Sequence, residues 1–250
     1  MHYTEWMRRA ATEQARLLAL LRALDPVDWV RPTDCAGWDV RAVAVHLMGN
    51  VIAAASPVEQ VRQLWDADRL RSARPDLDRL DALNEAVQRR FAALPPEHVM
   101  ARIGRSGPRS LTVRRLLLPP LRSVPVPFGP PLGTVAASYL LGTILTRDAW
   151  MHRIDLARAT GARLVLDAHD ALIVRDIAQE WGRRHGAAVE LELTGPAGGR
   201  FALGTGPGAR LTLDAVQFCR ITAGRVRDEG EGGGDGEGGG GGLLATRVSF

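Results

Sequence analysis

The sequence predicts an α+β protein, with a helical bundle over residues 1–163 and a small α+β domain over residues 164–250. Three observations carry this prediction. Apolar residues recur at helical spacing through most of the first part of the chain. Short segments of the second part alternate apolar and polar residues, as half-buried strands do. Residues 228–242 hold ten glycines and five acids without any period, which indicates a flexible insertion in the second domain.

The composition is typical of a globular protein. Hydrophobic residues make up 46% and charged residues 24% of the chain, which excludes a fibrous or wholly disordered protein. The 32 basic residues are all arginine and are interleaved with 28 acidic ones, so no basic stripe indicates nucleic-acid binding. The sequence contains no credible membrane span and does not open with the pattern of a secretory signal, so we expect a cytoplasmic protein.

Four helices are predicted in the first part of the bundle. The first covers residues 5–24 and ends before Pro26, because the residue that precedes a proline resists the helical conformation. Asp39 is placed to cap the second helix, residues 40–55, whose apolar residues on all sides are typical of a helix buried among others. Helical spacing predicts two more helices, over residues 57–71 and 77–94.

One long connection and one long helix complete the predicted bundle. Residues 103–131 are rich in proline, glycine and arginine, so we expect an irregular segment that crosses the bundle. Long segments of this kind are often functional. Residues 133–160 restore the helical period, and Gly161 stands where a glycine commonly ends a helix.

The second domain is expected to combine helices with short strands. One helix is predicted over residues 167–185 and a shorter one over residues 215–222. Alternation and turn residues predict strands at residues 189–193, 200–203 and 210–213, and a strand-like ending at residues 243–250.

Polar side chains interrupt two otherwise apolar helix faces in the bundle. Asp148 and His152 lie four residues apart, and therefore side by side on the inward face of the last bundle helix. His46 interrupts the second helix in the same way. Two imidazoles and a carboxylate that converge in a bundle can hold a divalent metal such as zinc. Two alternatives stay open: a surface ion pair between Asp148 and His152, and a core histidine at His46 bonded to a carbonyl.

Arginines are the natural candidates for holding a substrate carboxylate, because a guanidinium can pair with it through two parallel hydrogen bonds. Arg153 adjoins His152, and Arg225 lies in the second domain, which could cap the mouth of the bundle. We assign Arg153 and Arg225 as candidate catalytic residues. Cys35 lies near a helix start and is either a nucleophile or a small packed residue; with Cys219 far away in the chain, both thiols are expected to be free.

Two segments of the chain resemble the signature of a known family. The first is TDCAGWDVRAVAVHL, which contains His46, and the second is DAWMHRIDLARATG, which begins at Asp148. They look like the two signature segments of the mycothiol-dependent maleylpyruvate isomerase family, which belongs to the DinB-like four-helix-bundle superfamily. The second domain is more loosely similar to the small sterol-carrier-like α/β domain that many members attach.

The resemblance implies a zinc held by His46, Asp148 and His152. The family usually has glutamate where this chain has Asp148, and the shorter side chain would bring the metal closer to its helix. The resemblance also implies a low-molecular-weight thiol, mycothiol in the family, as the cofactor. Its thiolate would add to a small electrophile such as a cis-enedioate, and the resulting single bond could rotate before the thiol leaves.

This implied chemistry supports either an isomerase or a thiol S-transferase, since an adduct with no return path is simply a conjugate. The partners are then a small-molecule substrate and a thiol, with neither nucleic acid nor membrane. A second hypothesis is a non-catalytic metal-binding bundle whose second domain binds a ligand or a partner. The substitution at Asp148 and the insertion at residues 228–242 favour it. The sequence leaves the oligomeric state open.

Overall fold

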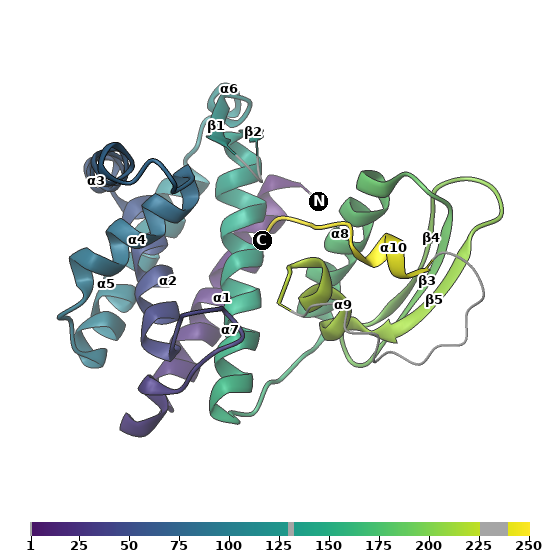
Figure 1. Ribbon diagram of the computed structural model, residues 1–250, viewed down its shortest axis with the longest axis horizontal. Coiled ribbons are helices and arrows are strands. Elements are labelled where there is room, and N and C mark those ends of the chain that lie inside the picture. Colours follow the sequence, from purple (N-terminus) through teal and green to yellow (C-terminus); the bar gives the residue numbers. More distant parts are fainter. Residues whose placement is uncertain (1, 130–132, 226–239) are drawn as a thin grey trace. The chain divides into compact units, whose positions relative to one another are not determined.

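Figure 1 shows the computed structural model of the chain, which describes residues 2–129, 133–225 and 240–250. The residues divide by their contacts into two compact units, Met1–Arg163 and Leu164–Phe250. The predicted combination of a helical first part with a small sheet in the second part is confirmed. Among the described helices, none has both the length and the apolar character that a membrane crossing requires.

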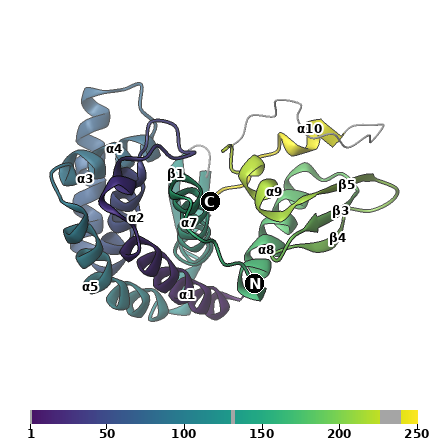
Figure 2. The ribbon, with the colours of Figure 1, turned by 90° about the horizontal axis from the view of Figure 1, so that it is seen from below.

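Four long helices form the centre of the first unit. Each contacts two others, so that they close a ring in the order α1, α5, α2 and α7 (Figure 1, Figure 2). Two further helices, α3 and α4, pack on each other and against α2. The bounds of these helices are α1 Tyr3–Arg22, α2 Val40–Ala55, α3 Pro57–Ala73, α4 Arg79–Phe91, α5 Pro96–Arg115 and α7 Leu145–Thr160.

The predicted helix cap at Asp39 and the predicted helix end at Gly161 are both present in the structure. The carboxylate of Asp39 accepts a hydrogen bond of 2.7 Å from the backbone N–H of Ala42 and so caps α2. Gly161 adopts a left-handed conformation, with φ of 71°, directly after α7. The core between these helices is aliphatic with a few aromatic residues and includes Leu17, Leu21, Trp29, Val43, Met48, Ile103 and Leu156.

The prediction of an irregular segment over residues 103–131 is wrong in its first half. Helix α5 continues to Arg115 with Pro108 inside it. Gly107 is a packing residue here, because a Cβ at this position would lie 2.8 Å from the side chain of Gln14 on α1. Close contact with α1 therefore outweighs the local helix-breaking tendency of proline and glycine. The segment then forms a short helix and a strand, α6 Pro119–Arg122 and β1 Pro125–Gly129.

The last bundle helix starts later than predicted. Residues Gly133–Ala136 form strand β2, which pairs with β1 in an antiparallel hairpin. A π-helical segment, Tyr139–Ile144, then leads directly into α7. Such wide turns are frequent beside functional sites, and here the segment ends four residues before Asp148.

The second unit packs helices on a three-stranded sheet. The strand order is β4, β3, β5, with β3 antiparallel to β4 and parallel to β5. Helix α8 contacts β4, and α9 contacts α8, β3 and β5. Trp181 and Phe218 meet edge to face in the core, 5.3 Å apart. The elements are α8 Ala168–His185, β3 Val189–Thr194, β4 Gly199–Leu203, β5 Ala209–Asp214, α9 Ala215–Thr222 and α10 Gly240–Leu244.

Two features were predicted near the end of the chain, a strand-like ending and a flexible insertion. The strand-like ending at residues 243–250 is wrong, because this segment starts in α10 and adds no strand. Its buried Val248 donates its backbone N–H to Thr222 at the end of α9, so the segment packs on a helix end. Most of the predicted insertion, residues 228–239, lies outside the described residues, and its last three residues belong to α10.

Candidate metal centre

Three side chains from two helices meet inside the bundle. His46 lies on α2, and Asp148 and His152 lie one turn apart on α7. The Nε2 atom of His46 is 3.2 Å from Oδ2 of Asp148, and the Nε2 atom of His152 is 3.3 Å from Oδ1. One candidate ligand atom from each residue lies within 4.8 Å of the other two. A single ion could therefore contact all three.

The far side of each imidazole ring has its own acceptor. The Nδ1 atom of His46 is 3.1 Å from Oδ1 of Asn84 on α4, and the Nδ1 atom of His152 is 3.0 Å from Oδ2 of Asp155. If each ring donates its N–H on this side, the lone pair of Nε2 points toward Asp148. Histidines that bind metals in proteins are held in this way by a second acceptor. The donor set therefore fits a divalent cation.

One aromatic side chain, Trp38, and one amide side chain, Asn50, lie beside the cluster. The ring of Trp38 lies 5.2 Å from the ring of His46 and 6.2 Å from that of His152. The amide nitrogen of Asn50 lies 3.0 Å from Oδ2 of Asp148. The two histidines are buried, with exposed fractions of 8% for His46 and 4% for His152. The cluster is thus polar at its centre and shielded from water around it.

Asp148 and His152 shift each other's pKa in opposite directions. Burial acts to raise the pKa of Asp148, but the neighbouring His46 and His152 lower it well below its ordinary value. Burial acts to lower the pKa of His152, but Asp148, then Asp155 and Cys35, raise it well above its ordinary value. Without a metal, a proton on His152 supplies the positive charge that the carboxylate attracts.

The comparisons with known proteins agree with this geometry. A family model, the mycothiol maleylpyruvate isomerase N-terminal domain, matches residues 10–157, which is more than half of the chain and includes His46, Asp148 and His152. The chain belongs to this family. The resemblance found in the sequence is thereby confirmed for the mycothiol maleylpyruvate isomerase family.

Two solved structures are similar to this member of the mycothiol maleylpyruvate isomerase family. One is a mycothiol-dependent maleylpyruvate isomerase, with a TM-score of 0.57, and the other is a histidine-to-alanine mutant of that name, with a TM-score of 0.60. Each match has 19% sequence identity and covers 91% of both chains. At this identity the likeness shows a shared fold. No curated protein matches the chain.

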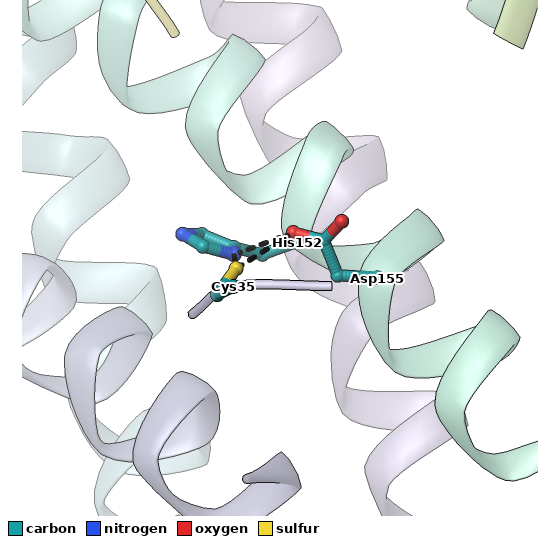
Figure 3. A group of neighbouring side chains, drawn as sticks. All are labelled: Cys35, His152 and Asp155. Carbon is teal, nitrogen blue, oxygen red and sulfur yellow. Dashed lines mark hydrogen bonds and ion pairs between the residues drawn. The ribbon is translucent and has the colours of Figure 1, made fainter. Parts of the chain in front are cut away.

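His152 also belongs to a second cluster, with Cys35 and Asp155. Figure 3 shows Cys35 and Asp155 on the Nδ1 side of its ring. The thiol of Cys35 donates to Oδ2 of Asp155 at 3.2 Å and lies 3.7 Å from Nδ1 of His152. Asp155 is fully buried. These three residues also lie close enough to share a cation. We interpret Asp155 as the residue that orients the ring of His152, because its carboxylate contacts Nδ1.

Some of these contacts had a signal in the sequence. Asn50 lies four residues after His46, and Asp155 lies three residues after His152, so each shares a helix face with a candidate ligand. No signal in the sequence indicated Asn84, because it lies on another helix, α4, which carries no candidate ligand. The sequence analysis named Cys35 as a nucleophile or a packed residue, and the structure places its thiol against Asp155.

The two candidate catalytic arginines lie in different units of the chain, and the structure bears only on Arg153. Arg153 faces Glu13 of α1, with Nε 2.8 Å from Oε2 and Nη2 3.2 Å from Oε1, and both side chains are buried. A guanidinium held by this carboxylate does not support the predicted role in binding substrate. Arg225 follows α9 in the second unit, and its role stays a prediction.

The affinity of the cluster for zinc should depend on Asp155, which contacts Nδ1 of His152. Replacing Asp155 with asparagine removes the negative charge that holds the ring, and we expect zinc to bind about 10- to 100-fold more weakly. Competition titration with a chromogenic chelator measures this change. Asp76→Asn is the matched control, because Asp76 is exposed and pairs only locally with Arg74. Equal zinc affinity in Asp155→Asn and the unaltered protein would contradict the assigned role.

The metal-free protein should lose stability as the pH rises. The raised pKa of His152 contributes stability that is fully present below the ordinary histidine pKa and is lost as the pH rises through the raised value. The lowered pKa of Asp148 contributes stability above the ordinary aspartate pKa, which is lost as the pH falls through the lowered value. Urea denaturation of the chelator-treated protein at a series of pH values measures both arms.

Zinc binding should follow the opposite trend on the alkaline side. Zinc bound at this cluster would have to displace the proton from His152, so its affinity should rise about tenfold per pH unit until the pH passes the raised pKa. The stability that the metal-free protein loses is then supplied by the metal. A stability of the metal-free protein that is constant on both sides of neutrality would contradict this account.

Proposed function

We propose that this protein is a metal-dependent enzyme that uses a low-molecular-weight thiol of the mycothiol type to isomerise a small electrophile, with a cis-enedioate as the substrate class. The observation that carries the proposal is the cluster of His46, Asp148 and His152, with both Nε2 atoms beside one carboxylate. The family membership supports the thiol and the reaction type.

The residues around the cluster have separate tasks in this proposal. His46, Asp148 and His152 would hold a divalent metal, for which zinc suits the nitrogen and oxygen donors. When bound, that metal would lower the pKa of a thiol so that it reacts as the thiolate. Asn84 and Asp155 would hold the two imidazole rings in the tautomer that leaves Nε2 free to bind the metal. Trp38 covers both rings and limits the access of water.

The proposed reaction needs no net proton transfer. When bound, the thiol would supply a nucleophile that adds reversibly to one carbon of the cis double bond, and that bond would be single in the adduct and free to rotate. Loss of the same thiolate would restore the double bond in the trans form, so addition and expulsion balance and the thiol would be regenerated in each cycle.

Product analysis with the purified, zinc-loaded protein tests this function. We expect NMR to show conversion of maleylpyruvate to its trans isomer only when both the protein and mycothiol are present. A stable thiol adduct instead of the trans isomer would indicate an S-transferase. A protein that binds zinc yet forms neither product would contradict the proposal and favour a non-catalytic metal-binding bundle.

A further inference from the structure

Arg114 is a buried arginine with no carboxylate partner among the described residues. It lies at the end of α5, and only 6% of its surface is exposed. Its Nη2 atom donates to the hydroxyl of Thr146 at 3.3 Å, and its Nε has no partner in the part of the chain that the structure describes. The other buried guanidinium described above, that of Arg153, faces Glu13.

The charge on Arg114 is retained despite this environment. Burial lowers the pKa of Arg114 to about 10, so the guanidinium is still protonated at neutral pH. A buried charge that lacks a counter-charge is strongly unfavourable. The hydroxyl of Tyr3 donates to the backbone oxygen of Arg114 at 2.8 Å and so fixes the position of the end of α5. The fold therefore holds a positive charge in a defined place, without an ion-pair partner among the described residues.

A small cavity connects Arg114 with the metal centre. Its volume is about 30 Å³, and its polar lining comes from Gln14, Asn50, Ser110, Arg114, Thr146 and Asp148. A volume of this size exceeds the minimum of about 10–15 Å³ that one water molecule needs, so the cavity has room for a small polar group. Asn50 marks the boundary with the metal centre, because its amide nitrogen lies 3.0 Å from Oδ2 of Asp148.

We propose that this cavity is a carboxylate-binding subsite in which Arg114 holds one carboxylate of the substrate. The inference rests on the proposed function, which supplies a substrate with a carboxylate attached to the reacting double bond. A carboxylate in the cavity would give Arg114 its missing counter-charge through charge-assisted hydrogen bonds, strengthened by the surrounding low dielectric. The double bond, only a few atoms away, would then lie near Asp148, where the proposed reaction would take place. Binding at the remote end would thus orient the reacting carbons.

Binding of maleate tests the subsite without any turnover. The titration uses the zinc-loaded full chain in the absence of thiol, with calorimetry as the readout. We expect Arg114→Met to bind maleate about 10- to 100-fold more weakly than the unaltered protein, because a charge-assisted interaction is lost. Zinc affinity should stay the same in both. Arg115→Met is the matched control, since Arg115 is the exposed neighbour on the same helix and should leave maleate binding unchanged.

Two further measurements separate a binding role from a structural one. The neutral diamide of maleic acid should bind the unaltered protein and Arg114→Met equally, because it offers no charge to the guanidinium. Without ligand, Arg114→Met should unfold at the same temperature as the unaltered protein or a higher one, and maleate should raise this temperature only when Arg114 is present. Should Arg114→Met fail to fold, Arg114→Lys replaces it, with weaker maleate binding expected from the loss of the planar fork.

Failure of this inference and failure of the proposed function give different results. Maleate that binds Arg114→Met, or Arg114→Lys in its place, as tightly as it binds the unaltered protein would overturn the subsite, even if thiol-dependent isomerisation is observed. Maleate binding that depends on Arg114 would support the subsite, even if isomerisation is absent and the proposed function fails.

Discussion

His152→Ala is expected to lose zinc almost completely, from about one ion per chain to a trace after dialysis. The substitution removes one of the three candidate ligands of this cluster, and with it the imidazole that lies against Asp148. Structural zinc sites are worth roughly 10–16 kcal/mol, so one ligand contributes about 3 kcal/mol, or more than a hundredfold in affinity. Elemental analysis of the purified protein measures the loss, and thiol-dependent turnover should fall with it.

The control for this experiment is His98→Ala. His98 is exposed on α5 and takes no part in the cluster, so its replacement should leave the zinc content and the circular dichroism spectrum unchanged. The spectrum of His152→Ala should also stay helical, because the bundle core consists of apolar contacts that the variant keeps. One zinc per chain in a folded His152→Ala would show that the ion binds elsewhere.

The largest expected loss of stability comes from Glu13→Ala. This change removes the carboxylate that faces the buried guanidinium of Arg153 across the α1–α7 contact. Breaking a buried ion pair from one side typically costs about 3–5 kcal/mol, because the remaining charge stays desolvated. Urea denaturation of the variant should show the free energy of unfolding reduced by this amount, a large fraction of the stability of a typical domain.

Two comparisons make the result specific. Glu85→Ala breaks the exposed pair between Glu85 and Arg89 on α4 and should cost less than about 1 kcal/mol. The double variant Glu13→Ala/Arg153→Met should recover much of the loss, because no charge then remains buried at this contact. A Glu13→Ala protein as stable as Glu85→Ala would contradict the assigned role of the buried pair.

The sequence could predict those features that depend on neighbours along one helix. Asp39 and Gly161 mark helix ends through backbone preferences that act within a few residues. Asp148 and His152 share a face because they lie one turn apart, and the structure brings both to His46. The inward direction of these faces followed from the apolar residues beside them.

Features that depend on contacts between helices could not be predicted in this way. Gly107 and Pro108 indicated a loop, whereas close packing of α5 on Gln14 keeps the segment helical. Asn84 and Arg114 belong to helices that share no motif with α7. Their importance follows from what they lie against: Asn84 from the ring of His46, and Arg114 from the cavity that it shares with Asp148.

Each residue placed at the candidate metal centre, and at the cavity beside it, belongs to the unit Met1–Arg163. The residues that would hold the ion are therefore encoded in one contiguous stretch of the gene. Substitutions in residues 164–250 would thus leave the three candidate ligands themselves unchanged.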